Sequence, residues 1–231
     1  MDYIIEPAKT SSVAVNGNEA RFPVRRIFCV GRNYEAHARE MGSDPNREPP
    51  FFFTKPADAV VDSGLTIPYP PETANLHYEA ELVVAIGRGG FRIDGADAAS
   101  HIFGYAVGND LTRRDLQSVA REAGRPWDWG KAFDRSAPCA PIHSVSDTGE
   151  LTSGEIKLSV NGETKQRSDL SLLIWNVGEI ISILSRSMEL KPGDLIYTGT
   201  PEGVGPLAVG DTVVASITGL TDLVTHVGEP V

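Results

Sequence analysis

The chain is divided at short intervals by turn-forming residues, and most of the segments between them have the composition of β-strands. We found no internal repeat and no low-complexity stretch. The expected strands span residues 26–30, 51–55, 81–86, 104–110, 156–160, 194–198 and 212–217. A chain of 231 residues with this pattern is expected to form one domain dominated by β structure.

Two turns and three helices complete the predicted framework. Asn161-Gly162 predicts a type I′ hairpin, because both central residues of that turn need a positive φ. Lys191-Pro192-Gly193-Asp194 predicts a second turn, which leads into a strand. The helices are expected over 34–40, 112–124 and 177–188. Strands interspersed irregularly with short helices indicate an α+β, mainly β fold rather than a doubly wound parallel sheet.

Each predicted helix has a candidate capping residue. Asn33 is expected to cap the first helix, which Gly42 would end. Thr112 is expected to cap the second, with Asp115 completing a variant of the capping box. Asn176 is expected to cap the third.

Composition and charge exclude several functional classes. A formal charge of −10 and a pI of about 5.0 argue against nucleic acid as a partner. Apolar runs are too short to cross a bilayer, and the amino terminus lacks the features of a secretory signal, so we expect a cytoplasmic protein. Cys29 and Cys139 lack metal-knuckle spacing and are expected to be packing residues.

The segment LHYEAELVVAIG places His77, Glu79 and Glu81 at alternate positions of an expected buried strand. Two carboxylates on one face would repel each other unless a cation lies between them. Asp110, at the end of the next strand, offers a third carboxylate. Three carboxylates favour Mg²⁺ or Mn²⁺, with Ca²⁺ as an alternative and zinc disfavoured despite His77. The competing interpretation is an edge strand with solvated acids.

A second candidate group lies in GRNYEAHARE, where His37 and Glu40 are neighbours on one helix face. The carboxylate could orient the imidazole as a general base, although such pairs are also common on solvated faces. Gly31 and the loop Gly42-Ser43-Asp44-Pro45 could let this segment move as a lid over bound substrate.

Further candidate residues are cations and anion-binding groups. Lys131, among aromatic residues, could stabilise a developing enolate or could simply lie at the surface. Arg114 and Gln117 are spaced to grip a carboxylate from one helix face, although helical arginines are often solvated. The loop TGTPEGVG could bind an anion through its amides and Thr200, or could be only a turn.

Several motifs resemble, in order, those of the fumarylacetoacetate hydrolase family, and the match runs from about residue 25 to the end of the chain. These motifs are GRNYEAHARE, FFFTKPADAV, LHYEAEL, GNDLTRRDLQ, GKAFD, LSVNGE and LKPGDLIYTGTPEGVGPL. The resemblance is to short single-domain acylpyruvate hydrolases, and REMGSDPNREPPFFFTKPADAVV is most similar to the fumarylpyruvate hydrolases. It implies a mixed β-roll over 25–231, with residues 1–24 as an extension packed on it. It also implies a homodimer with one divalent ion per subunit.

The resemblance also implies roles for individual residues. Glu79, Glu81 and Asp110 match metal ligands, while His37 and Glu40 match a water-activating dyad on a mobile helix. Lys131 matches an enolate-stabilising lysine. The residues expected to hold the substrate are Arg32, Lys55, Arg114, Gln117 and Thr200.

The implied reaction is metal-dependent hydrolysis of the carbon–carbon bond of an acylpyruvate, a 2-oxo acid. For fumarylpyruvate, an intermediate of gentisate-type aromatic degradation, the products would be fumarate and pyruvate. A fumaryl group needs a cation for its distal carboxylate, and the sequence offers Arg32, Arg113 and Arg125. The alternative activities are oxaloacetate decarboxylation and decarboxylation or isomerisation of related diacids, which need the same metal and enolate chemistry.

Overall fold

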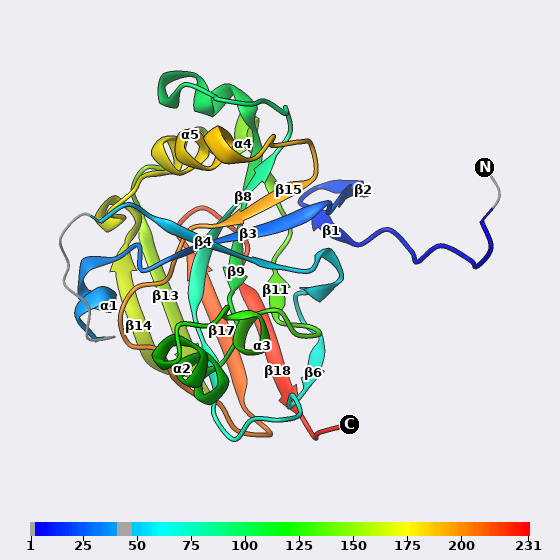
Figure 1. The fold of residues 1–231 in the computed structure, drawn as a ribbon, viewed down its shortest axis with the longest axis vertical. Coiled ribbons are helices and arrows are strands. Elements are labelled where there is room, and N and C mark those ends of the chain that lie inside the picture. Colours follow the sequence, from blue (N-terminus) through cyan, green and yellow to red (C-terminus); the bar gives the residue numbers. More distant parts are fainter. Residues whose placement is uncertain (1–2, 41–47) are drawn as a thin grey trace.

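The computed structural model describes residues 3–40 and 48–231, and its main element is a large curled β-sheet (Figure 1). This sheet has eight strands, ordered β4-β3-β15-β8-β9-β11-β5 with β12 pairing with β9. The bounds are β3 Arg26–Gly31, β4 Phe51–Lys55, β5 Val60–Asp62, β8 Ala80–Ile86, β9 Ile102–Asn109, β11 Ala137–Cys139, β12 His143–Ser144 and β15 Asp194–Tyr197. The mainly β roll that the sequence predicts is confirmed.

A second sheet packs against one face of the first. It has five strands in the order β14-β13-β17-β18-β6. These are β6 Thr66–Pro68, β13 Glu155–Val160, β14 Glu163–Asp169, β17 Thr212–Ile217 and β18 Leu223–Gly228. The smaller sheets are β1 Ser12–Val15 with β2 Asn18–Pro23, and β10 Thr112–Arg113 with β7 Leu76–Tyr78 and β16 Gly205–Pro206.

Strand β8 is buried along its whole length because both faces of the large sheet are covered. Leu82, Val84 and Ile86 contribute to the core shared with the five-stranded sheet. Val83 and Ala85 point into a second core, which the β1–β2 hairpin closes from the other side. A strand buried on both faces can hold a charged side chain only where partners neutralise it, and this frames the site described below.

The helices are short and lie outside the sheets (Figure 1). They are α1 Glu35–Glu40, α2 Arg114–Glu122, α3 Asp128–Lys131, α4 Val145–Thr148 and α5 Val177–Ser187, with 3-10 turns at Ala57–Ala59, Gly95–His101 and Leu170–Leu172. No helix among the described residues is long and apolar enough to cross a bilayer. The predicted cap Asn176 is confirmed, since its side chain accepts from the Glu179 amide at 3.0 Å in a full capping box.

Two predicted caps are wrong, and both were overridden by long-range contacts. Thr112 pairs with His77 in a β-bridge, so α2 begins only at Arg114 and has no side-chain cap. The Asn33 amide instead donates to the carbonyls of Trp175 and Thr198, at 2.9 and 2.8 Å. The predicted helix end at Gly42 and the loop 42–45 lie outside the described residues.

Both predicted turns are present. Asn161 and Gly162 have φ values of 51° and 83° between β13 and β14, which confirms the type I′ hairpin. The Asp194 amide donates to the Lys191 carbonyl at 3.1 Å, closing the turn before β15. All seven predicted strands are confirmed to within a few residues.

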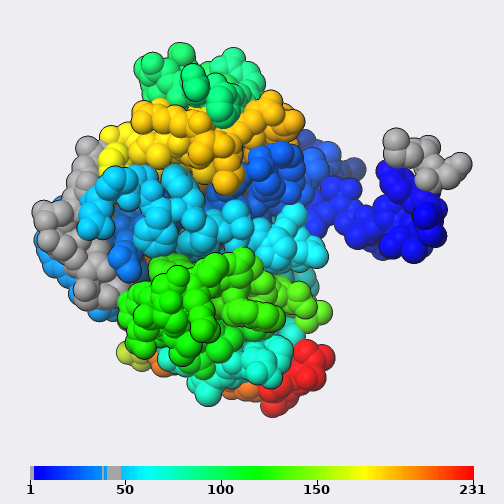
Figure 2. All heavy atoms as spheres, in the orientation of Figure 1, coloured from blue at the N-terminus to red at the C-terminus, as the bar shows by residue number. Residues whose placement is uncertain are grey.

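The amino-terminal segment has two parts. The β1–β2 hairpin packs on the large sheet, where Phe22 stacks on Phe103 with ring centroids 5.2 Å apart. Residues 3–10 extend away from the body, as the spheres in Figure 2 show, and leave Tyr3, Ile4 and Ile5 exposed.

Candidate active site

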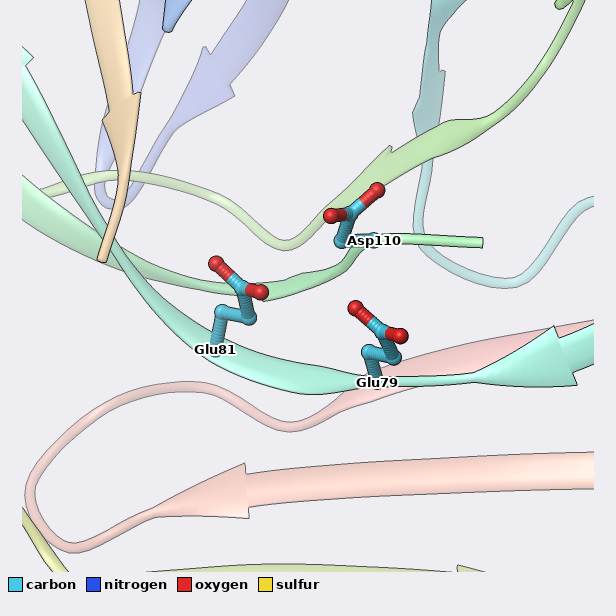
Figure 3. Close-up of side chains that lie close together, drawn as sticks. All are labelled: Glu79, Glu81 and Asp110. Carbon is cyan, nitrogen blue, oxygen red and sulfur yellow. The ribbon is translucent and has the colours of Figure 1, made fainter. Parts of the chain in front are cut away.

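Three carboxylates converge at the end of the large sheet. Glu79 lies in the break between β7 and β8, Glu81 is in β8, and Asp110 directly follows β9. Each offers an oxygen, and these oxygens lie within 4.8 Å of one another. Figure 3 shows the three carboxylates gathered in one place. The pairing of Ala80 with Asn109 brings the two chain segments to the same level. The three side chains therefore lie together as the sequence predicted.

The acids are buried among cations. Lys131 Nζ lies 2.8 Å from Glu79 Oε2 and 2.7 Å from Asp110 Oδ2. Lys55 Nζ lies 2.8 Å from Asp110 Oδ1, and Arg114 pairs with Glu79. Glu81 forms no ion pair with a described residue, and its Oε2 accepts a 2.8 Å hydrogen bond from the Gly199 amide.

The pKa shifts follow this unequal pairing. Burial, with Asp110 and Glu79 nearby, raises the pKa of Glu81 well above its ordinary value. Burial acts in the same direction on Glu79, but Lys131 and Arg114 outweigh it and hold that pKa well below the usual range. Glu81 is therefore the carboxylate that most needs a further cation.

This donor set fits a hard divalent ion. Three buried carboxylates provide oxygen ligands of the kind that Mg²⁺, Mn²⁺ and Ca²⁺ prefer. His77 is not among them. Its Nδ1 accepts from Arg114 Nε at 3.3 Å, and its Nε2 lies 2.9 Å from Asn75 Oδ1. Burial, aided by Arg114, lowers the His77 pKa to about 4, so the ring is neutral near pH 7.

One member of the candidate dyad, His37, lines the same pocket, whereas Glu40 lies outside the lining. His37 is buried, and its Nδ1 lies 3.1 Å from Glu40 Oε2. The hydrogen bond from His37, followed by the Gly203 amide, lowers the pKa of Glu40 despite partial burial. The Gly203 amide lies 3.2 Å from both oxygens of Glu40, which ties helix α1 to the loop after β15.

The loop after β15 is held in place by Asn33, Lys165 and Gln166. Gly199 and Gly203 have φ values of 99° and 88°, and a Cβ on either would clash with Asn33 or with the Lys165 carbonyl. Gln166, which the sequence did not single out, donates from Nε2 to Thr200 Oγ1 at 2.9 Å and to the Pro201 carbonyl at 2.8 Å. In the sequence, only the glycines of this loop indicated its positive φ angles and close backbone contacts.

The pocket contains most, but not all, of the predicted residues. It encloses about 420 Å³ of space, counting the part open to solvent. Its lining comprises Val30, Gly31, Arg32, His37, Phe53, Glu79, Glu81, Asp110, Arg114, Gln117, Arg121, Trp127, Lys131 and Thr200. Lys55 lies behind Asp110 rather than in the lining, and its Nζ donates to the carbonyls of Leu111 and Lys131.

Two of the three predicted distal arginines lie elsewhere. Arg113 is stacked over the Phe133 ring, with its guanidinium carbon 4.4 Å from the centroid, and Arg125 is exposed outside the pocket. Arg121, which the sequence interpretation missed, does line the pocket together with Arg32. Its spacing of seven residues from Arg114 on one helix could have indicated this position.

Comparisons with known proteins agree with this geometry. The model of the fumarylacetoacetate (FAA) hydrolase C-terminal domain matches residues 26–228. A fumarylpyruvate hydrolase from Ralstonia sp. is 50% identical over 185 residues, covering 80% of this chain and 96% of that protein. An oxaloacetate tautomerase of Escherichia coli strain K12 is 38% identical over 199 residues, covering 86% and 90%.

A solved structure is similar over nearly the whole chain. The crystal structure of fumarylpyruvate hydrolase from Pseudomonas aeruginosa in complex with Mn²⁺ and pyruvate has a TM-score of 0.97 and 54% identity. The alignment covers 99% of this chain and 100% of that one. The fold and the matched sequence together confirm the predicted family: the chain belongs to the fumarylacetoacetate hydrolase family.

Proposed function

We propose that this protein hydrolyses the carbon–carbon bond of acylpyruvates and that fumarylpyruvate is its substrate. The observation that carries the proposal is that the carboxylate cluster, Lys131 and His37 line one pocket. The similarity to fumarylpyruvate hydrolases at 50% and 54% identity supports the choice of substrate. Water would add at the 4-oxo carbon, the bond between carbons 3 and 4 would break, and fumarate and pyruvate would form.

The resident metal in this proposal is Mg²⁺, with Mn²⁺ as a substitute and Ca²⁺ as the alternative, held by Glu79, Glu81 and Asp110. The Mn²⁺ in the Pseudomonas homologue supports a divalent ion here. When bound, the ion would supply Lewis-acid stabilisation of negative charge on the oxygens of the 2-oxo acid.

The protein's own groups would bind the substrate and move the protons. We call the three carboxylates, with Lys131 and Arg114 paired to them, the floor of the pocket. Arg114, Gln117 and Thr200 would hold the carboxylate of the pyruvyl end there. His37, oriented by Glu40, would take a proton from water as that water attacks. The Lys131 ammonium would stabilise the negative charge that develops on the departing pyruvate. Asp110 and Glu79 support this role, because they outweigh burial and raise the pKa of Lys131.

The closing of α1 over the pocket belongs to the same proposal. Gly203 donates to Glu40 in this structure, so α1 is docked where its histidine faces the carboxylate cluster. We propose that α1 acts as a lid that excludes bulk water during turnover.

The test is the loss of the ultraviolet absorbance of the enol form of fumarylpyruvate, measured beside acetylpyruvate and oxaloacetate. We expect fast, Mg²⁺-dependent loss with fumarylpyruvate, which a chelator stops and His37→Ala greatly slows. If oxaloacetate alone is consumed and His37→Ala matters little, the proposal of a hydrolase is wrong.

A second candidate activity acts on oxaloacetate. The similarity to the E. coli oxaloacetate tautomerase at 38% identity favours it, since tautomerisation or decarboxylation needs an enolate-stabilising floor but no activated water. Dependence on His37 and Glu40 in the same assay separates this activity from hydrolysis.

We also propose a cytoplasmic homodimer in which residues 25–231 form the catalytic domain and residues 1–24 an extension. Two buried free cysteines, Cys29 and Cys139, support a reducing compartment. The exposed Tyr3, Ile4 and Ile5 support burial of the extension against a second copy. Sedimentation of the full chain and of a chain lacking residues 1–10 tests the dimer, which the shorter chain should form more weakly.

A further inference from the structure

The pocket has a cationic end beyond its acid cluster. Arg114 is 7% exposed and already contacts Glu79 and Gln117 at the floor. Arg32 and Arg121 also line the pocket, but both are only partly buried. Positive charge is therefore present toward the open side as well as at the floor.

Helix α2 relates the two ends. Arg114, Gln117 and Arg121 follow one another at intervals of three and four residues, so they share one face of the helix. Two turns separate Arg114 from Arg121, which places their backbones about 10.5 Å apart along the axis. The helix therefore presents a second arginine to the pocket, two turns beyond the first.

An aromatic wall lies beside these two arginines. Trp127 and Phe53 line the pocket, with ring centroids 5.7 Å apart, and Phe51 meets Trp127 edge-on at 5.1 Å. The Arg32 guanidinium carbon lies 5.6 Å from the Phe51 ring centroid. Figure 2 shows the α2–α3 segment, in green, directly beside the light-blue segment that contains β4. The rings of Phe53 and Trp127 give the pocket apolar surface against which a planar, conjugated carbon chain can pack.

We propose that Arg121, assisted by Arg32, binds the distal carboxylate of the substrate and thereby selects acylpyruvates whose acyl group ends in an acid. This inference rests on the proposed function. Six bonds separate the carboxylate carbons of fumarylpyruvate, an extended span of about 7 Å. Three bonds separate those of oxaloacetate, about half that span, so its second carboxylate would remain near the floor. The arginine side chains are long enough to make up the difference between the span of the substrate and the separation of the two backbones.

The test compares Arg121→Gln with Arg125→Gln, which removes the same charge from an exposed position outside the pocket. Loss of a charge-assisted hydrogen bond is expected to lower kcat/KM for fumarylpyruvate about 10- to 100-fold in the first variant. The value for acetylpyruvate, which lacks the distal acid, should stay within about twofold in both variants. Arg121→Lys, which keeps the charge but not the planar fork, should retain an intermediate value.

Inhibition by oxalate provides a second readout. Oxalate is short enough to occupy the floor alone, so its inhibition constant should be the same in wild type and in Arg121→Gln. Equal losses with fumarylpyruvate and acetylpyruvate, or no loss with either, would overturn the assignment of Arg121. Failure of the wild type to hydrolyse any acylpyruvate would instead overturn the proposed function, so the two failures are distinguishable. Far-ultraviolet circular dichroism checks that each variant is folded.

Discussion

The floor of the pocket and the His37–Glu40 dyad differ in how firmly the chain holds them. The acids of the floor are 1% to 4% exposed and come from or directly adjoin strands of the large sheet. Glu40 belongs to a six-residue helix, its side chain is 36% exposed, and among the described residues it makes hydrogen bonds with His37 and the Gly203 amide. The carboxylates and their cations, which would stabilise negative charge, are thus fixed in the core. The His37–Glu40 dyad, which would transfer the proton, lies on a short helix outside the sheets.

Fixing the floor requires charge balance. Isolated buried carboxylates are strongly disfavoured, and three of them are accommodated because three cations lie beside them. The acids are Glu79, Glu81 and Asp110, and the cations are Lys55, Lys131 and Arg114. The dyad needs no such balance. A change at the floor should therefore affect both metal binding and turnover, whereas a change at the dyad should affect turnover only.

The largest effect is expected from Glu81→Gln. Loss of a metal ligand should weaken Mn²⁺ binding, measured by titration calorimetry, and reduce turnover at least about 10,000-fold, because a bound metal supplies several kcal/mol of stabilisation. Glu163→Gln is the matched control, since Glu163 is exposed and pairs only with Lys165 among the ion pairs of the described residues. Unaltered Mn²⁺ affinity in Glu81→Gln would remove that residue from the metal site.

A smaller effect is expected from His37→Ala. Turnover should fall about 100- to 10,000-fold, the range for a positioned acid–base group, while Mn²⁺ affinity remains unchanged. His143→Ala, outside the pocket and hydrogen-bonded to Thr221, should leave both quantities unaltered. A parallel loss of Mn²⁺ binding in His37→Ala would show that dyad and floor are not separable.

Lys55→Met probes the floor from behind. Removing one of the two lysines paired with Asp110 should lower turnover about 10- to 100-fold, as for other residues that support a metal ligand. It should also destabilise the metal-free protein by about 3 kcal/mol, because Asp110 Oδ1 and the buried carbonyls of Leu111 and Lys131 lose a partner. Denaturant unfolding measures this difference against Arg21→Met, which breaks an exposed pair with Asp62 and should cost less than about 1 kcal/mol. Equal costs in the two variants would contradict the buried pairing.

The smallest effect concerns pH and the docking of α1. The folded-state pKa of Glu40 is lowered, so its contact with Gly203 contributes fully above the ordinary glutamate pKa of about 4.3 and is lost as the pH falls through the lowered value. Hydrogen-exchange protection of the Gly203 amide should therefore decline at acid pH. The Ala140 amide, which donates to Val107 at 2.8 Å in the sheet, is the control. Gly203 protection that follows that of Ala140 throughout an acid titration to complete protonation of Glu40 would contradict this docking contact.

The sequence predicts the floor better than the dyad's surroundings for a physical reason. Alternation in a strand fixes the face of Glu81 locally, and the strong apolar run that follows identifies the buried strand. Thr112 and Asn33 are residue types that often cap helices, but both have partners 35 or more residues away. The backbone of Thr112 pairs with His77, and the side chain of Asn33 is hydrogen-bonded to Trp175. Local capping preferences are too weak to prevail over such tertiary contacts.

How deep each side chain lies in the pocket could not be predicted from the sequence either. Lys55 was predicted to hold the oxoacid end of the substrate and Arg32 was a candidate for the distal end, yet Lys55 lies behind Asp110 and only Arg32 lines the pocket. Arg121 was missed although it shares a helix face with Arg114, because the sequence does not show that this face borders the pocket along its whole length. Strand β18 was also missed, since the buried Thr225 interrupts its apolar alternation.

The loop 198–203 reaches both halves of the site through its peptide groups: the Gly199 N–H donates to Glu81, and the Gly203 N–H donates to Glu40. An alanine scan would add a methyl group at Gly199 and Gly203 and would leave their two N–H donors in place. Its results at these positions would report backbone strain instead. Replacing individual peptide bonds by esters deletes one N–H at a time and would measure how strongly each contact couples the loop to Glu81 and to helix α1.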